Sequence, residues 1–211
     1  MTVNETYSLG VIILAAGRSS RMGQPKLLLP WGKTSILGHL IQQWQDLGAE
    51  QISVVCCQDN VRLDAELDRL NFALSSRIVN PNPQRGMFSS IQCAAEWSGW
   101  EPDLTHWAIV LGDQPHLSVE TLRTIMNFSA ANSDKVCQPR KDGHRYHPVV
   151  LPRKAFEQIR RSLATNLKEF LASCEGAYCE TKDAGLELDI DRPEDYDKAL
   201  EVWKTSGKPT T

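Results

Sequence analysis

The stretch GVIILAAGRSSRMGQPK, residues 10–26, joins an apolar run to a polar loop that carries glycine and basic residues. The run GVIILAAG predicts a buried strand that ends in a glycine turn. Residues 15–17 (Ala-Ala-Gly) lack bulky side chains, so backbone N–H groups after the strand could face the phosphates of a ligand. Arg21 and Lys26 add positive charge to the same segment. The pattern is neither GxGxxG nor GxxxxGK[ST], so it indicates another kind of phosphate-binding loop, or a turn with solvated basic residues.

Outward from this stretch, short apolar runs alternate with amphipathic stretches. The predicted strands are GVIILAAG, QISVVC, SRIVN and HWAIVLGD, and the predicted helices span 36–47, 59–70, 89–97 and 118–128, the last with Ser118 as N-cap. In the second half, DKVCQPR, HPVVLP, AYCE and LELDID predict strands, 141–145 a turn, and 154–163 and 166–173 helices, with a final helix from Pro193.

This alternation predicts an α/β fold with a largely parallel sheet that is covered by helices on both faces. Ligands of such folds bind beyond the carboxyl ends of the strands. The two most polar strand exits are LAAGRSSRMG and LGDQP, and we therefore expect the functional site between them.

Composition narrows the classes of function. The 211 residues fit one domain, whose ordered core we expect over about residues 10–205. A net charge of -3 without a basic run argues against a nucleic-acid partner, and no apolar stretch is long enough to span a membrane. The first ten residues lack a secretory pattern, and the six cysteines include no CxxC pair. We expect a cytoplasmic protein with reduced thiols.

Acidic residues follow two of the predicted strands. Asp113, in the GDQP segment, ends the strongest strand and could hold a hard cation, although a plain turn is the alternative. Asp189 and Asp191, in LDIDRPEDY, are expected on one face of a strand, where their charges repel unless a cation or solvent intervenes. An exposed edge strand is the alternative for this pair.

Two further segments are polar. NPNPQRGMFSS, residues 80–90, predicts a long loop that leads into a helix and could contact a nucleotide or be an ordinary surface loop. GHRYHPVV contains His144 and His147, but two histidines without further ligands are weak evidence for zinc.

A strand followed by LAAGxSxRMGxxK resembles the signature of the MobA-like NTP transferases, and more narrowly their molybdenum cofactor cytidylyltransferase branch. The matching positions are Leu14, Ala15, Ala16, Gly17, Ser19, Arg21, Met22, Gly23 and Lys26. The resemblance covers roughly residues 11–200. It implies a three-layer α/β/α, Rossmann-like, mostly parallel mixed sheet of the nucleotide-diphospho-sugar transferase type.

The resemblance also implies roles for the matching residues. Lys26, Arg21 and Asp113 would be catalytic, and Asp113 and Asp191 would hold Mg²⁺. The implied nucleotide-binding residues are Leu14, Ala15, Ala16, Gly17, Arg21, Lys26, Gly86, Met87, Ser90 and Asp113. On the acceptor side the implied residues are His147 and Pro148, with Asp189 as a further candidate. Here the chain departs from the family, because Tyr146 replaces an expected glycine and the segment around Asn166 lacks the usual glycines.

The implied reaction transfers a nucleoside monophosphate from an NTP to a phosphorylated acceptor. The LAAG form, rather than LAGG, favours CTP over GTP, and the branch implies molybdopterin or its molybdenum-loaded form as acceptor. A transient contact with a molybdoenzyme or its chaperone would follow. Two alternatives stay open: a sugar phosphate or another phosphorylated alcohol as acceptor, and a delivery protein that binds molybdopterin without turnover.

Overall fold

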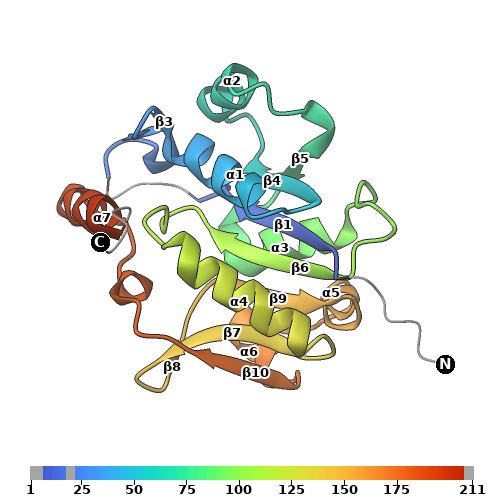
Figure 1. Ribbon diagram of the computed structural model, residues 1–211. Coiled ribbons are helices and arrows are strands. Elements are labelled where there is room, and N and C mark those ends of the chain that lie inside the picture. Colours follow the sequence, from blue (N-terminus) through green and yellow to red (C-terminus); the bar gives the residue numbers. More distant parts are fainter. Residues whose placement is uncertain (1–6, 18–21, 207–211) are drawn as a thin grey trace.

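The structure, a computed structural model, describes residues 7–17 and 22–206. Within these residues its centre is a mixed sheet of eight strands (Figure 1). The order across the sheet is β10-β7-β9-β6-β1-β4-β5, and β8 pairs with β7. The strands are β1 (Leu9–Leu14), β4 (Gln51–Cys57), β5 (Arg77–Asn80), β6 (His106–Leu111), β7 (Val136–Lys141), β8 (His144–Arg145), β9 (Val149–Pro152) and β10 (Gly176–Glu180).

Strand β1 lies inside the parallel part of the sheet. It pairs in parallel with β4 on one side and with β6 on the other. Strand β9 runs antiparallel between β6 and β7, which makes the sheet mixed. Because both faces of β1 are covered, its sequence LGVIIL is apolar throughout and shows no alternation with polar residues.

Helices cover both faces of the sheet. One face carries α1 (Ile36–Asp46), α2 (Val61–Arg69) and α4 (Val119–Ala131); the other carries α3 (Met87–Glu96), α5 (Arg153–Ile159) and α6 (Leu167–Ala172). Successive strand residues point to opposite faces, so Val11 and Ile13 pack into the first core cluster and Ile12 into the second. The predicted three-layer α/β/α architecture with a mostly parallel mixed sheet is confirmed.

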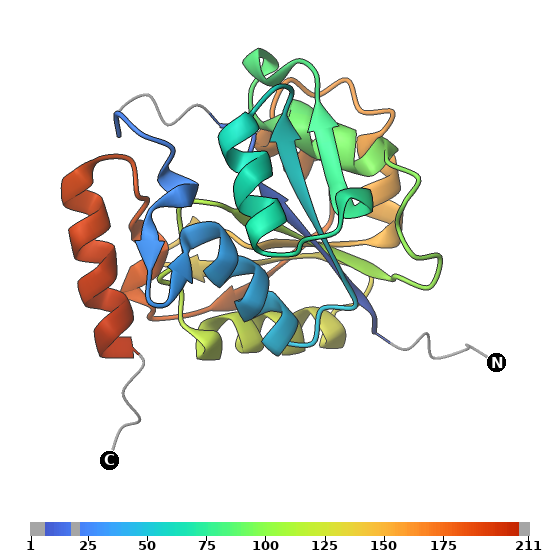
Figure 2. The same ribbon diagram turned by 90° about the horizontal axis from the view of Figure 1, so that it is seen from above.

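The last helix, α7 (Pro193–Ser206), lies apart from the main sheet. Figure 2 shows it beside a small hairpin of β2 (Pro30–Trp31) and β3 (Thr34–Ser35), which the sequence did not predict. Among residues 7–17 and 22–206, none of the helices has the length and apolar character needed to cross a bilayer.

Several predicted elements were wrong in type or extent. LELDID forms no strand; a 3-10 helix at Ala184–Glu187 leads into an irregular segment. Helix α3 begins at Met87, two residues before its predicted start, and α5 ends at Ile159 because a turn follows. The predicted turn at 141–145 is tighter than expected: Asp142 and Gly143 both take positive φ, and β8 follows at once.

Candidate active site

Strands β1 and β6 are neighbours, run in parallel and end together, since Leu14 pairs with Leu111. Each strand is followed by one of the two polar segments singled out in the sequence. The loop with Gly17 leaves β1, and the Gly112–Asp113 turn leaves β6. The two strongest motifs therefore meet at the carboxyl edge of the sheet, where ligands bind in this class of fold.

A cavity of about 320 Å³ opens at this edge. Its lining includes Leu14, Ala15, Ala16, Gly17, Lys26, Gly86, Met87, Ser90 and Asp113, together with Leu27, Pro83, Leu111 and Gly112. Nine of the ten residues expected around a nucleotide are thus gathered around one space. The tenth, Arg21, lies outside the described residues, as does Ser19.

Gly112 brings the β6 turn close to β1. A Cβ atom at this position would lie 2.6 Å from Cδ2 of Leu27 and 3.0 Å from the carbonyl oxygen of Leu14. Among the described residues, a Cβ atom at Gly17 would meet nothing within 4 Å, so that glycine leaves open space beside the cavity. Gly112 therefore serves packing, whereas Gly17 leaves the loop backbone accessible.

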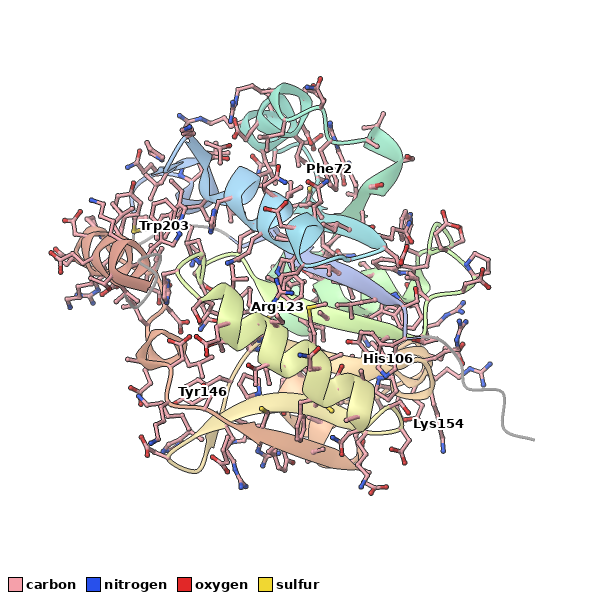
Figure 3. All side chains as sticks on the ribbon, in the orientation of Figure 1. Phe72, His106, Arg123, Tyr146, Lys154 and Trp203 are labelled. Atoms are coloured by element: carbon pink, nitrogen blue, oxygen red, sulfur yellow. The ribbon has the colours of Figure 1, made fainter. Side chains whose placement is uncertain are left out.

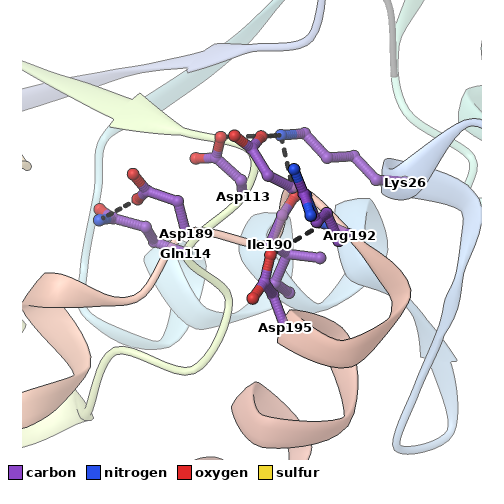
Figure 4. A network of polar contacts seen from close by, with 8 residues as sticks. Lys26, Asp113, Gln114, Asp189, Ile190, Arg192 and Asp195 are labelled. Atoms are coloured by element: carbon purple, nitrogen blue, oxygen red, sulfur yellow. Dashed lines mark hydrogen bonds and ion pairs between the residues drawn. The ribbon is translucent and has the colours of Figure 1, made fainter. Parts of the chain in front are cut away.

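Lys26 links the two acidic segments. It begins a short 3-10 helix (Lys26–Leu28), and its Nζ lies 2.8 Å from Oδ2 of Asp113, 3.4 Å from Oδ1 of Asp191 and 3.1 Å from the carbonyl oxygen of Ile190 (Figure 4). The Lys26 and Asp113 side chains are 18% and 22% exposed, so this pair is less screened by water than a surface ion pair. One ammonium group thus joins three parts of the chain that are distant in sequence.

Asp113 retains one oxygen that could bind a cation. Its Oδ2 accepts a hydrogen bond from Lys26, whereas its buried Oδ1 has no hydrogen-bond partner within the described part of the chain. A buried carboxylate oxygen is costly to leave unpaired, and a divalent cation would satisfy it. In residues 7–17 and 22–206, no group of three or more His, Cys, Asp or Glu side chains could hold a metal by itself. The unpaired oxygen of Asp113 could bind a divalent cation, which would complete its shell with phosphate oxygens and water.

Asp189 and Asp191 flank the buried residue Ile190, whose N–H donates to the carbonyl oxygen of Asp113. The predicted strand was wrong, because this backbone pairs with a turn and not with another strand. Asp189 accepts a hydrogen bond from Gln114 Nε2 at 2.8 Å. Burial raises the pKa of Asp189, and the negative charge of Asp113 raises it further. The three carboxylates thus share one electrostatic environment with Lys26.

Asn80 organises the loop on the other side of the cavity. Its side chain is 1% exposed, donates to Ser89 Oγ and Ser90 Oγ at 2.9 Å each, and accepts from the backbone N–H of Asn82. Gly86 has φ of +92° and precedes α3, so the chain turns here into the helix that carries Ser90. Sequence reasoning did not single out Asn80; its position at a strand exit, before a proline-rich loop, was the available signal.

His147 and Pro148 do not line this cavity. They border a separate space of about 10 Å³ next to Gln114 and Trp44. The Nδ1 atom of His147 lies 3.4 Å from the carbonyl oxygen of Ile109, and burial lowers the pKa of His147. His144 is exposed on β8, so the structure gives no support to a zinc pair of these histidines.

Residues 11–178 match the MobA-like NTP transferase domain. The chain belongs to the MobA-like NTP transferases. This MobA-like NTP transferase is 29% identical over 197 residues to the molybdenum cofactor cytidylyltransferase of Escherichia coli (strain K12), covering 93% of this chain and 97% of that protein.

Two solved structures are similar to this MobA-like NTP transferase along nearly its whole length. Rv0371c from Mycobacterium tuberculosis H37Rv superposes with a TM-score of 0.70 at 25% identity, covering 92% of this chain and 98% of that one. The manganese complex of the same M. tuberculosis protein gives a TM-score of 0.67 at 24% identity, with coverages of 92% and 98%.

Family membership makes the chain a nucleotidyltransferase. The family match includes the Gly17 loop, Asp113 and His147, but it ends before Asp189 and Asp191. The family match therefore covers the Gly17 loop and the β6 turn, whereas the fold places the second acidic segment of this MobA-like NTP transferase beside them.

Proposed function

We propose that this chain transfers CMP from CTP to the terminal phosphate of molybdopterin, or of its molybdenum-loaded form, with Mg²⁺ and with release of pyrophosphate. The observation that carries the proposal is the convergence of the Gly17 loop, Lys26 and Asp113 on one cavity. The similarity to the E. coli cytidylyltransferase over 93% of the chain supports the choice of donor and acceptor.

The reaction is an in-line displacement. A terminal phosphate oxygen of the acceptor attacks the α-phosphorus of CTP, and the bond from that phosphorus to the oxygen that bridges to the β-phosphate breaks. A phosphate monoester has a second pKa near ~6, so the nucleophile is largely dianionic at neutral pH and needs no general base. The residues of the chain act by positioning and by neutralising charge.

The Gly17 loop and four charged side chains have separate tasks in this scheme. Backbone N–H groups of the Gly17 loop bind the triphosphate, with Arg21 on the β- and γ-phosphates. Lys26 offers its ammonium group to the α-phosphate, where negative charge accumulates. Asp113 and Asp191 hold the Mg²⁺, which when bound neutralises phosphate charge. A manganese complex is known for the M. tuberculosis protein of this fold, which favours a divalent cation here as well.

On the acceptor side we propose Asp189, with His147 and Pro148 behind it as support for the GDQP turn. Asp189 lies beside Asp113, on the side of the carboxylates away from Lys26, and accepts a hydrogen bond from Gln114. Tyr146 stands where relatives carry glycine, so this part of the acceptor pocket has a shape of its own.

The test is pyrophosphate release with CTP, GTP, ATP or UTP, with Mg²⁺, and with or without molybdopterin. We expect release only with CTP, and only when molybdopterin is present. Release that requires a sugar phosphate would replace the acceptor, and release with GTP would replace the donor. NTP binding without any release would favour a delivery protein.

A further inference from the structure

Helix α7 contacts the rest of the protein through aromatic side chains. The ring of Trp203, which α7 carries (Figure 3), lies 5.2 Å from that of Trp31 and 5.4 Å from that of His39, and the Trp31 ring lies 6.0 Å from that of Tyr196. Tyr196 also donates its hydroxyl proton to the carbonyl oxygen of Pro30 at 2.5 Å. We call Trp31, His39, Tyr196 and Trp203 the aromatic cluster.

The hairpin is shaped to receive Trp203. Gly32, in the turn between β2 and β3, has φ of +61°, and a Cβ atom there would lie 2.8 Å from Cη2 of Trp203. Any other residue would be strained in this backbone conformation and would also push the indole away. The contact between α7 and the hairpin therefore depends on glycine at position 32, which leaves room for the Trp203 ring.

The aromatic cluster reaches the GDQP turn through His39. The Nε2–H of His39 donates to the carbonyl oxygen of Pro115 at 3.0 Å, while the ring contacts Trp31 and Trp203. Pro115 follows Asp113 by two residues. The position of the first carboxylate is thus connected to the aromatic cluster.

The second carboxylate is connected to the same cluster through the chain. Asp191 stands two residues before the first residue of α7, and its side chain, which is 46% exposed, lies 3.4 Å from Nζ of Lys26. The segment forms no strand, and its backbone is held at Ile190, whose N–H donates to Asp113 and whose carbonyl oxygen accepts from Lys26, and by α7, which begins at Pro193. Asp191 thus lies between this fixed point and the start of α7, so a shift of α7 would move its carboxylate relative to that of Asp113.

We propose that Trp203 is a positioning residue, which acts through the aromatic cluster to set the distance between the carboxylates of Asp113 and Asp191 and hence the affinity of the site for a divalent cation. This inference rests on the proposed function, because it takes the two carboxylates as the metal ligands. Outer residues that orient metal ligands typically contribute about 10- to 100-fold to metal affinity.

The experiment measures Mn²⁺ binding to the full chain by electron paramagnetic resonance, with CTP present, for the wild type and three variants. Trp203→Ala should weaken Mn²⁺ binding by about tenfold, whereas Trp203→Phe keeps a ring and should restore most of it. Trp97→Ala is the matched control, because Trp97 is another half-buried tryptophan that meets a neighbouring ring edge-on, that of Trp100 at 5.0 Å, but packs against the other core cluster. Its Mn²⁺ affinity should equal that of the wild type.

The variant His39→Phe tests independently whether the aromatic cluster affects Mn²⁺ binding. It keeps an aromatic ring in the cluster but removes the hydrogen bond to Pro115, and it should also weaken Mn²⁺ binding. Circular dichroism spectra and CTP affinity without metal report whether each variant keeps its fold and its nucleotide site. If Trp203→Ala and His39→Phe both fold and bind Mn²⁺ as the wild type does, or if Trp97→Ala loses as much Mn²⁺ affinity as they do, the positioning role is wrong. Neither outcome would affect the proposed function. A wild-type chain that binds no Mn²⁺ and releases no pyrophosphate would overturn the proposed function with it.

Discussion

The Nζ atom of Lys26 lies 2.8 Å from Oδ2 of Asp113, although 87 positions separate the two residues in the chain. The lysine comes from the loop that follows β1, and the aspartate comes from the turn that follows β6. A positive and a negative group are thereby held together at the point where both phosphates and a cation would have to bind. The parallel pairing of β1 with β6 is what produces this meeting.

Replacing Lys26 by methionine should lower the rate of pyrophosphate release by on the order of 10²-fold, because a stabiliser of charge in the transition state is lost. The methionine side chain is similar in length and apolar, so the partly buried stem keeps its packing. Steady-state assays and a circular dichroism spectrum check this. An unfolded variant would make Lys26 structural, and a fully active one would remove it from the mechanism.

Asp113→Asn keeps the shape of the side chain but removes its charge. We expect loss of metal-dependent turnover by more than ~10²-fold, with Mn²⁺ binding weakened in parallel. Isothermal titration with Mn²⁺ separates the metal from the nucleotide. Asp183→Asn is a suitable control, since Asp183 bonds to Thr121 at the start of α4 and does not line the cavity.

The substitutions Gly112→Ala and Gly17→Ala should have different effects on stability and on KM. At Gly112 the new methyl group would collide with the Leu14 carbonyl oxygen and with Leu27, so we expect a loss of about 1–3 kcal/mol in the free energy of unfolding. At Gly17 the methyl group meets no atom of the described residues within 4 Å, and stability should change by less than about 0.5 kcal/mol while KM for the NTP rises. Urea denaturation and kinetics together check the contrast.

Asn80→Ala should raise KM for the NTP more than it lowers kcat, since Asn80 orients Ser90 and the loop behind it. The variant leaves buried hydroxyl groups with fewer partners, so a loss of about 1–3 kcal/mol in stability is expected as well. Asn132→Ala is matched to it, because Asn132 donates to the carbonyl oxygen of Phe128 near the end of α4. An equal rise of KM in both variants would trace the effect to stability alone.

The buried ring of His116 should make the stability of the fold depend on pH. The side chain is 1% exposed, Nε2 donates to the carbonyl oxygen of Gly185 at 2.8 Å, and the buried Nδ1 has no partner within residues 7–17 and 22–206. Burial lowers the pKa of His116, so the unfolded chain binds a proton more readily than the folded one. This contribution to stability is complete above about pH 6.5 and is lost as the pH falls toward the folded-state pKa.

The measurement compares the free energy of unfolding at several pH values for the wild type and His116→Gln. Glutamine can keep a donor near Gly185 but cannot take up a proton. We expect a smaller decrease of stability below pH 6.5 in the variant. Equal slopes in the two proteins would assign the acid sensitivity to other groups.

The layers of the fold were predictable because their signals are local. GVIILAAG and HWAIVLGD are continuous apolar runs, which is how strands covered on both faces read. The segment LELDID was misread for the opposite reason. Leu188 and Ile190 alternate with acidic residues as in a half-buried strand, yet this backbone is held by Asp113 and Lys26 and not by a neighbouring strand.

The candidate site was predictable only in part. The residues around the cavity come from three short segments, and their resemblance to a family located them. The contacts of His39 with Pro115, Tyr196 with Pro30 and Asn80 with Ser90 join positions whose pairing the chain order does not reveal. Such supporting contacts require the fold.

The antiparallel course of β9 has a consequence for how such a protein can diversify. Strand β7 ends and β9 begins at the same edge as the cavity, so residues 142–148, including β8, form a finger that joins them there. A finger between two antiparallel strands can change in length or in its charged residues without altering the register of either strand. The loops after β1 and β6 have no such freedom, because Gly112 and Lys26 tie them to each other. If the acceptor binds on this side of the site, as we propose, changes in the finger would alter acceptor choice without altering the loops proposed to bind the nucleotide.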